Sequence, residues 1–210
     1  MWGQSQIEVG LPHQQAELFS DHAARALVVF AHGDGGNRTS WRSREMAHAL
    51  QRRGLSSLLV DLLTPAESDD KESLYDIDLL AGRLMQVLDA LPADLCQLPL
   101  GLLGSDTGTA AAIVVAVRRS PGVRALVSRG GRPELAGDVL GALRAATLLI
   151  VGAADADVLA HNRRAYLQLR CHKRIDIVPR ATHQFLEAGA FDAATRLAGD
   201  WFAAHLVPQG

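Results

Sequence analysis

The sequence has 210 residues, a length that is typical of one domain and that allows a sizeable hydrophobic core. Hydrophobic residues make up 48% and charged residues 21%, which is the composition of a folded globular protein and excludes a disordered tail or a fibre. The formal net charge is −2, without the basic excess that a nucleic-acid or anionic-membrane partner requires. We therefore expect one domain over residues 1–210 and neither kind of partner.

Cysteine usage and the N-terminal segment indicate the compartment. Cys96 and Cys171 are too few for a disulfide framework and lack metal-ligand spacing. Residues 1–6 contain neither a basic stretch nor an apolar run, so no signal peptide is expected. The longest apolar run, residues 110–117, is much shorter than the ~20 residues of a membrane span. The prediction is a cytoplasmic protein.

Apolar runs of strand length alternate with helical patterns along the chain. The stretch before Ala26 is weaker and predicts one or two short antiparallel edge strands, around residues 6–9 and 15–18. The stronger predicted strands are residues 26–31, 55–62, 98–104, 123–128, 147–151 and 174–178. The predicted helices are residues 41–53, 72–91, 107–118, 158–169 and 191–206. Because parallel neighbours need a crossover, this alternation predicts a single α/β domain with a mostly parallel, doubly wound sheet.

The sharpest motif follows the third of the strong strands, in the segment Gly104-Ser105-Asp106-Thr107-Gly108. Glycines two residues before and two residues after Asp106 have the spacing of a nucleophile elbow, a strained strand-to-helix turn that raises the central side chain above the sheet. Glycine suits these positions because the tight turn leaves no room for neighbouring side chains. Ser105 lies outside this frame and is interpreted as a turn residue.

Three more strand ends carry residues with catalytic potential. The glycine-rich turn His32-Gly33-Asp34-Gly35-Gly36 follows the first strong strand and offers backbone N–H groups to an oxyanion. Asp155 and Asp157 follow the next-to-last strand, and His183 follows the last. Ligands of doubly wound sheets bind at the carboxyl ends of the strands, so these residues are expected to meet. An elbow residue, an acid and a histidine in this chain order is the order of the α/β-hydrolases.

On these segments the chain resembles the α/β-hydrolase superfamily, and within it the small dienelactone hydrolase-like branch that has no cap domain. The matching stretches are FAHGDGGNRTSWRSRE, LLVDLLTP, GLLGSDTGTAAA, VSRGGRPELAG, TLLIVGAADADVLAHNR and VPRATHQF, which span most of the chain. The residues that the resemblance assigns to a catalytic triad are Asp106, Asp155 and His183. Asp157 is the other candidate acid. The resemblance also implies a hydrolase whose oxyanion hole is formed by the backbone N–H groups of Asp34 and Thr107.

Most relatives in this branch carry serine where this sequence has Asp106. A carboxylate has a pKa of about 3.9 and is ionised without help from a histidine. After attack on an ester carbonyl it would leave far more readily than an alkoxide, because its conjugate acid is stronger by roughly ten pKa units or more. An aspartate succeeds instead at saturated carbon, where it displaces a halide or opens an epoxide. His183, oriented by Asp155, would then activate the water that cleaves the resulting ester.

The sequence leaves an alternative open. Haloalkane dehalogenases and epoxide hydrolases usually place a bulky residue after the aspartate, where this chain has Thr107, and they carry a helical cap. The segment between residues 128 and 147 holds only a short helix, and Tyr75 and Tyr166 lie in or near helices rather than in a cap. The alternative is a silent binding protein that kept the hydrolase pocket and lost the serine. The matched order of Asp155 and His183 favours an active hydrolase.

A dinucleotide-binding oxidoreductase is a minor alternative. Arg38 stands where the G-x-G-x-x-G fingerprint needs its last glycine, and Asp61 follows later than the ~20 residues expected for a ribose-binding acid.

Two arginines are candidate substrate-binding residues. Arg38 lies just past the glycine-rich turn, and Arg129 just past the strand 123–128. If both reach the pocket they favour a small, carboxylate-bearing substrate, because guanidinium groups bind carboxylates in a bidentate way. The alternative is that both are solvated or ion-paired. No HExxH motif, paired cysteine or carboxylate cluster indicates a metal, and we expect no cofactor. Oligomeric state does not follow from the sequence.

Overall fold

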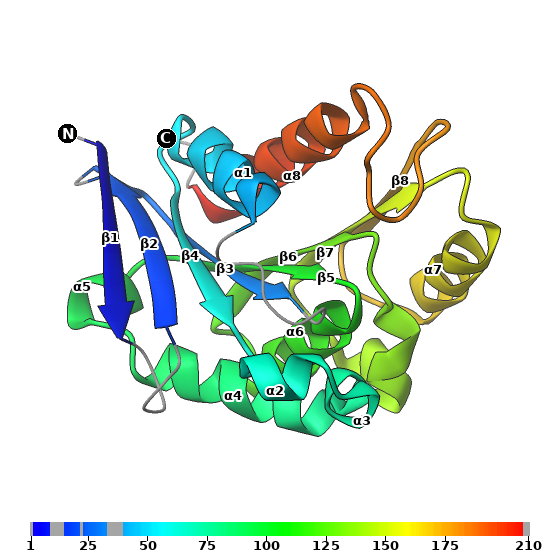
Figure 1. Ribbon diagram of the computed structural model, residues 1–210, viewed down its shortest axis with the longest axis horizontal. Coiled ribbons are helices and arrows are strands. Elements are labelled where there is room, and N and C mark those ends of the chain that lie inside the picture. Colours follow the sequence, from blue (N-terminus) through cyan, green and yellow to red (C-terminus); the bar gives the residue numbers. More distant parts are fainter. Residues whose placement is uncertain (1, 9–14, 22, 33–39, 208–210) are drawn as a thin grey trace.

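Eight strands form one sheet in the order β1-β2-β4-β3-β5-β6-β7-β8 (Figure 1). The computed structural model describes residues 2–8, 15–21, 23–32 and 40–207, and the statements below concern these residues. The strands are β1 (Trp2–Glu8), β2 (Gln15–Asp21), β3 (Leu27–His32), β4 (Ser56–Asp61), β5 (Leu100–Ser105), β6 (Val123–Arg129), β7 (Ala146–Gly152) and β8 (Lys173–Val178). β3 to β8 pair in parallel, whereas β1 and β2 are antiparallel to their neighbours. The mostly parallel sheet and its antiparallel edge are as predicted.

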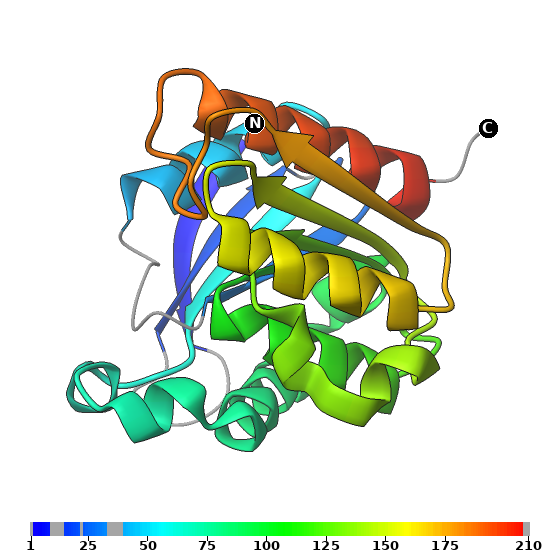
Figure 2. The same cartoon turned by 90° about the vertical axis from the view of Figure 1, so that its right-hand side faces the viewer.

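Helices cover both faces of this sheet, which makes it doubly wound (Figures 1 and 2). One face carries α1 (Trp41–Gln51) and α8 (Ala190–Leu206). The other face carries α4 (Ile77–Asp89), α6 (Thr107–Arg118) and α7 (Ala156–Gln168). The short helices are α2 (Pro65–Ser68), α3 (Lys71–Tyr75), α5 (Ala93–Cys96) and the 3₁₀ helix η1 (Pro133–Ala142). The architecture is a single-domain α/β fold of the α/β-hydrolase type.

The core consists of two hydrophobic clusters, one on each face of the sheet. Within β3, Leu27 and Val29 belong to the cluster under α4 and α6, whereas Val28 and Phe30 belong to the cluster under α1 and α8. Successive side chains of a strand point to opposite faces, so a strand covered on both faces needs apolar residues throughout. This explains the near-continuous apolar runs of the sequence.

One predicted helix differs from the structure. The helix expected over residues 72–91 is interrupted at Asp76, which separates α3 from α4. The Asp76 carboxylate accepts a hydrogen bond from the backbone N–H of Leu79 at 2.9 Å and so caps α4. An aspartate bound to the backbone in this way favours a helix start over a helix interior. Between β6 and β7 lies the ten-residue η1, and no cap domain stands there.

Candidate active site

A sharp turn joins β5 to α6 at Asp106. This residue has φ 45° and ψ −133°, a conformation that costs a non-glycine residue energy and that persists only where the surroundings enforce it. The neighbouring Gly104 shows why space is scarce, since a Cβ there would lie 2.5 Å from Cα of Thr109. The Asp106 carbonyl accepts hydrogen bonds from the backbone N–H groups of Thr109 at 3.1 Å and Arg132 at 3.0 Å. The turn is therefore held from both α6 and the segment after β6.

The connections after β7 and β8 bring an acid and an imidazole together. His183 Nδ1 donates a hydrogen bond to Oδ2 of Asp155 at 2.5 Å. Asp155 is the N-cap residue of α7, and its other oxygen accepts from the backbone N–H of Val158 at 3.3 Å. Burial raises the pKa of the Asp155 carboxyl, but the hydrogen bonds from His183 and Val158 and the charge of His183 outweigh burial and lower the pKa. Asp157, the other candidate acid, is exposed in the first turn of α7.

The loop that carries His183 is positioned mainly by its backbone. A Cβ at Gly130 would lie 2.1 Å from the carbonyl oxygen of His183, and a Cβ at Gly152 would lie 2.3 Å from that of Ala181. The loop therefore packs directly on the ends of β6 and β7, where only glycine fits. Phe185, which is 1% exposed, anchors the far side of the loop in the core despite its φ of 54°.

Asp106 and His183 line one cavity of about 220 Å³. The described residues that line it are Ser40, Arg42, Ser43, Ser105, Asp106, Arg129, Gly130, His183 and Gln184. Arg129 is the last residue of β6 and His183 lies in the connection after β8, whereas Arg42 belongs to α1, which follows β3. Since β5 lies between β3 and β6 in the sheet, Asp106 stands between one wall formed by α1 and another formed by the end of β6 and the connection after β8. This cavity at the carboxyl ends of the strands is the candidate active site.

The other residues predicted for the site fall into two groups. Arg129 ends β6 and lines the cavity, with its guanidinium carbon 5.9 Å from the ring centroid of Phe191. Thr107 is the first residue of α6, and its side chain is buried. Asp34 and Arg38 lie outside the described residues. The part of the oxyanion hole assigned to Asp34 and the substrate contact assigned to Arg38 therefore stay predictions.

Several lining residues were not singled out from the sequence. Arg42 and Ser43 lie in the first turn of α1, and the Ser43 hydroxyl is 3.3 Å from Nε2 of the buried His32. The interpretation of Ser105 as a turn residue is wrong, because it is the last residue of β5 and is paired in register with His32 of β3. The sequence located α1 correctly, but helical spacing alone does not tell which part of a helix faces a site.

Arg132 is a further cation near the turn. Its Nε donates to Glu134 at 2.5 Å, and this hydrogen bond raises the pKa of the guanidinium, with smaller contributions from the charges of Glu134, Tyr75 and Asp106. Burial of Arg132 acts in the opposite direction. The side chain of Arg132 is thus ion-paired with Glu134.

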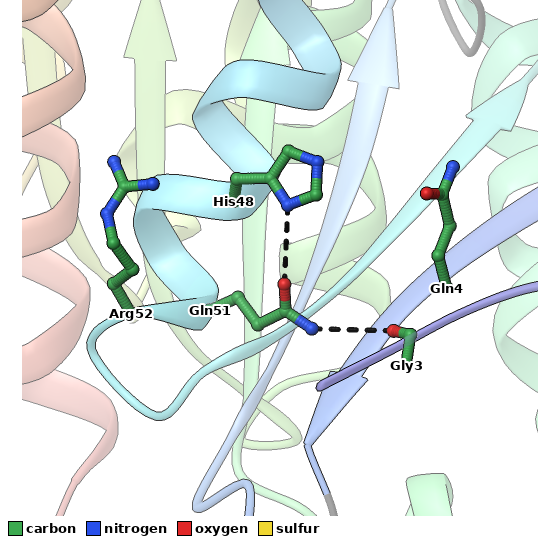
Figure 3. Close-up of a pocket in the computed structure, with 5 residues that line it drawn as sticks. All are labelled: Gly3, Gln4, His48, Gln51 and Arg52. Atoms are coloured by element: carbon green, nitrogen blue, oxygen red, sulfur yellow. Dashed lines mark hydrogen bonds between the residues drawn. The ribbon is translucent and has the colours of Figure 1, made fainter. Parts of the chain in front are cut away.

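A second hollow, of about 490 Å³, lies between β1 and the C-terminal half of α1 (Figure 3). Its lining residues are Gly3, Gln4, His48, Gln51 and Arg52. Gln51 binds backbone carbonyls of Gly3 at 3.4 Å and Ser20 at 2.8 Å, which ties α1 to the edge strands. None of the five described lining residues is an acid, a serine or a cysteine. Within the described part of the chain, no group of three or more potential metal ligands was found, and no helix is long and apolar enough to cross a bilayer.

Comparison with known proteins identifies the family. The chain aligns with a crystal structure of a dienelactone hydrolase from Anabaena variabilis at 42% identity, covering 98% of each chain with a TM-score of 0.91. The chain belongs to the dienelactone hydrolase family. A dienelactone hydrolase-like promiscuous phosphotriesterase from metagenomic libraries, at 20% identity and a TM-score of 0.74, shares the fold over 96% of this chain and 98% of its own. No protein-family model matches the sequence.

A longer relative carries a different name. The chain is 47% identical, over 188 residues, to a Mycobacterium tuberculosis protein named "Putative phosphoribosyl transferase". The aligned segment is 89% of this chain but 42% of that protein. This dienelactone hydrolase-family chain thus spans about two-fifths of the length of the curated relatives that it matches.

Proposed function

We propose that this member of the dienelactone hydrolase family is a hydrolase of small molecules in which Asp106 attacks saturated carbon. One observation carries the proposal. Asp106 stands in a strained turn and lines the same cavity as His183, whose Nδ1 is hydrogen-bonded to Asp155. A nucleophile, a base and a residue that orients the base are the parts that covalent hydrolysis requires.

The reaction has two steps. In the first, an Oδ atom of Asp106 forms a bond to the substrate carbon, and the leaving group departs with the electron pair of its bond. In the second, Nε2 of His183 takes a proton from water, and the hydroxide adds to the carboxyl carbon of the Asp106 ester. The ester then expels the product alkoxide, which takes up the proton from His183. Asp106 is left as a carboxylic acid with one oxygen atom from water, and it releases the remaining proton to solvent to regenerate the carboxylate.

The cavity favours a small acid with a carbon–halogen bond over an epoxide. A volume of about 220 Å³ accommodates a compound of a few carbon atoms, and Arg129 offers a guanidinium group for a substrate carboxylate. An epoxide needs an acid that protonates its oxygen as the ring opens. Neither Tyr75 nor Tyr166 is among the described residues that line the cavity. A halide leaves as a stable anion and needs no such proton.

The name of the Mycobacterium tuberculosis relatives does not lead us to propose phosphoribosyl transfer for this chain. Their name belongs to proteins of which the chain matches 42% of the length. A phosphoribosyl diphosphate donor carries several negative charges, whereas the described lining residues supply two arginines and one aspartate.

Trapping the covalent ester tests the proposal. The protein is prepared with Cys96→Ser, because the exposed free thiol of Cys96 itself reacts with haloacids. We expect halide release from chloroacetate or bromoacetate, and a His183→Gln variant should accumulate an added carboxymethyl group on the peptide that contains Asp106. An ester at Asp106 is removed by hydroxylamine, whereas a thioether is not. A single turnover in heavy-oxygen water should label Asp106 and leave the first product molecule unlabelled.

A second variant separates this reaction from the silent binding protein. Asp106→Ser restores the serine of most relatives and is assayed on p-nitrophenyl esters, with Asp157→Asn as the matched control for loss of an acid near the site. Ester hydrolysis by Asp106→Ser, together with no haloacid turnover and no trapped ester in the other forms, would overturn the proposal. That result would identify a hydrolase pocket whose nucleophile has been lost.

A further inference from the structure

Strand β8 forms one edge of the sheet, and no described strand pairs with its outer side (Figures 1 and 2). The backbone N–H of Thr147 donates to the carbonyl of His172 at 2.8 Å, and that of Ala153 donates to the carbonyl of Val178 at 3.0 Å. Backbone groups of successive residues in a strand point alternately to its two sides, so the even-numbered residues of β8 bond to β7. The odd-numbered residues offer their N–H and C=O groups to another strand. These residues are Lys173, Ile175 and Ile177.

The side chains of the same residues lie on the α7 face of the sheet and leave the edge largely apolar. Ile175 packs against the core cluster that α7 covers, and Ile177 is 41% exposed. Natural edge strands are often protected from pairing by an outward charge, frequently a lysine. Lys173 does not protect this edge in that way, because its Nζ donates to the carbonyls of Tyr166 and Leu169, each at 2.6 Å, at the C-terminal end of α7. Its aliphatic stem is what remains along the edge.

The α8 face of β8 carries a cation and an anion. Arg174 lies over the ring of Trp201 in α8, with its guanidinium carbon 5.4 Å from the ring centroid, and its Nη2 donates to Oδ2 of Asp176 at 2.6 Å. The two charged residues flank Ile175 in the sequence. A strand with this pattern is complementary to itself. When a second copy runs antiparallel with Ile175 opposite Ile175, Arg174 of each copy faces Asp176 of the other.

Other registers of antiparallel pairing are less favourable. A twofold axis at any of the charged residues of β8 places two like charges opposite each other, which destabilises a cross-strand pair. An axis at Ile177 brings Ile175 opposite Pro179, which has no N–H to donate. With the axis at Ile175, every outward N–H and C=O of β8 finds a partner, because Ile175 pairs with Ile175 and Lys173 pairs with Ile177.

We infer that β8 is an interaction surface for a second copy of this chain, with which it forms a continuous sheet across a twofold axis at Ile175. Arg174 and Asp176 then occupy the positions of an antiparallel pair that exchange no backbone hydrogen bonds, where facing side chains lie closest. On the opposite face, Ile177 of each copy lies against the aliphatic stem of Lys173 of the other. The inference is independent of the reaction proposed at Asp106.

Sedimentation equilibrium over a range of protein concentrations at low salt tests this surface. We expect a concentration-dependent dimer of the wild type. Asp176→Arg places arginine opposite arginine and Arg174→Asp places aspartate opposite aspartate, so each variant alone should dimerise about tenfold more weakly or worse. An equimolar mixture restores opposite charges at each facing pair and should form a heterodimer. Asp94→Arg, in α5 and away from β8 (Figure 1), is the control for charge reversal and should leave the dimer unchanged.

A further variant addresses the backbone pairing. Ile177→Pro removes an N–H that points away from β7, so it should weaken the dimer while β8 stays bonded to β7. Circular dichroism confirms that each variant is folded, and recovery on mixing guards against a folding defect in either charge variant. Three results would overturn the inference: a wild type that stays monomeric at hundreds of micromolar, a dimer that neither the charge reversals nor Ile177→Pro weakens, or folded charge variants that remain monomeric when mixed.

Discussion

His183 Nδ1 lies 2.5 Å from Asp155 Oδ2, although the two residues come from the connections after different strands, β8 and β7. The bond determines which nitrogen of the imidazole carries the proton. Nδ1 donates to the carboxylate, so Nε2 is the nitrogen that remains to accept a proton from water. Because the pKa of Asp155 is lowered, the acceptor is ionised at neutral pH.

Asp155→Asn should lower the free energy of unfolding by about 1 kcal/mol at pH 7, since a charged acceptor is replaced by a neutral amide. The folded pKa of Asp155 is below its ordinary value of 3.8, so the stabilisation is complete above that value and is lost as the pH falls through the folded pKa. Urea denaturation at pH 7 and pH 3 measures the difference in free energy of unfolding between the wild type and Asp155→Asn. This difference should be smaller at pH 3. The exposed Asp157→Asn is the control and should change stability by less than about 0.5 kcal/mol.

Arg129→Gln should raise KM for haloacids about tenfold or more while kcat changes less, because the guanidinium holds the substrate carboxylate before and during attack. Steady-state halide release measures both constants. Arg129→Lys keeps the charge but loses the bidentate geometry, so its KM should lie between those of the wild type and Arg129→Gln. Equal kcat losses in both variants with unchanged KM would contradict a binding role.

Glu67→Gln should destabilise the fold by about 1–2 kcal/mol at pH 7. The Arg83 guanidinium binds both oxygens of Glu67 at 2.6 Å, and Thr64 adds further hydrogen bonds, so the pKa of Glu67 falls to about 2 from 4.5. A lowered folded pKa gives a stabilisation that is present above pH 4.5 and disappears as the pH approaches 2. Denaturant midpoints across this range measure it. Glu72→Gln, an exposed acid in the first turn of α3, should show no comparable pH dependence.

Gly104→Ala should destabilise the protein by about 1–3 kcal/mol, because the new Cβ meets the backbone of Thr109 at 2.5 Å and the turn at Asp106 must shift. Gly82→Ala is the matched substitution within α4, where a Cβ meets nothing within 4 Å, and it should stabilise the helix by roughly 0.5–1 kcal/mol. Thermal unfolding of the two variants gives opposite shifts in Tm if the turn is as tight as described. An unchanged Tm in Gly104→Ala would show instead that the turn relaxes without cost.

The fold and the centre of the site were accessible from the sequence for a topological reason. Parallel strands bring their carboxyl ends to one edge, so reading the residues after each strand found Asp106, Asp155 and His183 together. The wall formed by α1 was not found, because whether Arg42 or Arg44 faces a site depends on how the helix packs. The break at Asp76 was missed because a single capping hydrogen bond outweighed a continuous apolar pattern.

The glycines at positions 130 and 152 have a consequence for how this molecule can change. They allow close contact between main-chain segments, so the backbone of the His183 loop is positioned by these glycines, while the hydrogen bond to Asp155 orients the imidazole. An exchange of the residue at the apex of the β5–α6 bend, or of either arginine, can therefore alter the reaction while the base stays where it is. In this scaffold the base, His183 with Asp155, is held independently of the nucleophile position and of the substrate-binding arginines. Single substitutions at those positions are therefore a practical way to engineer new reactions.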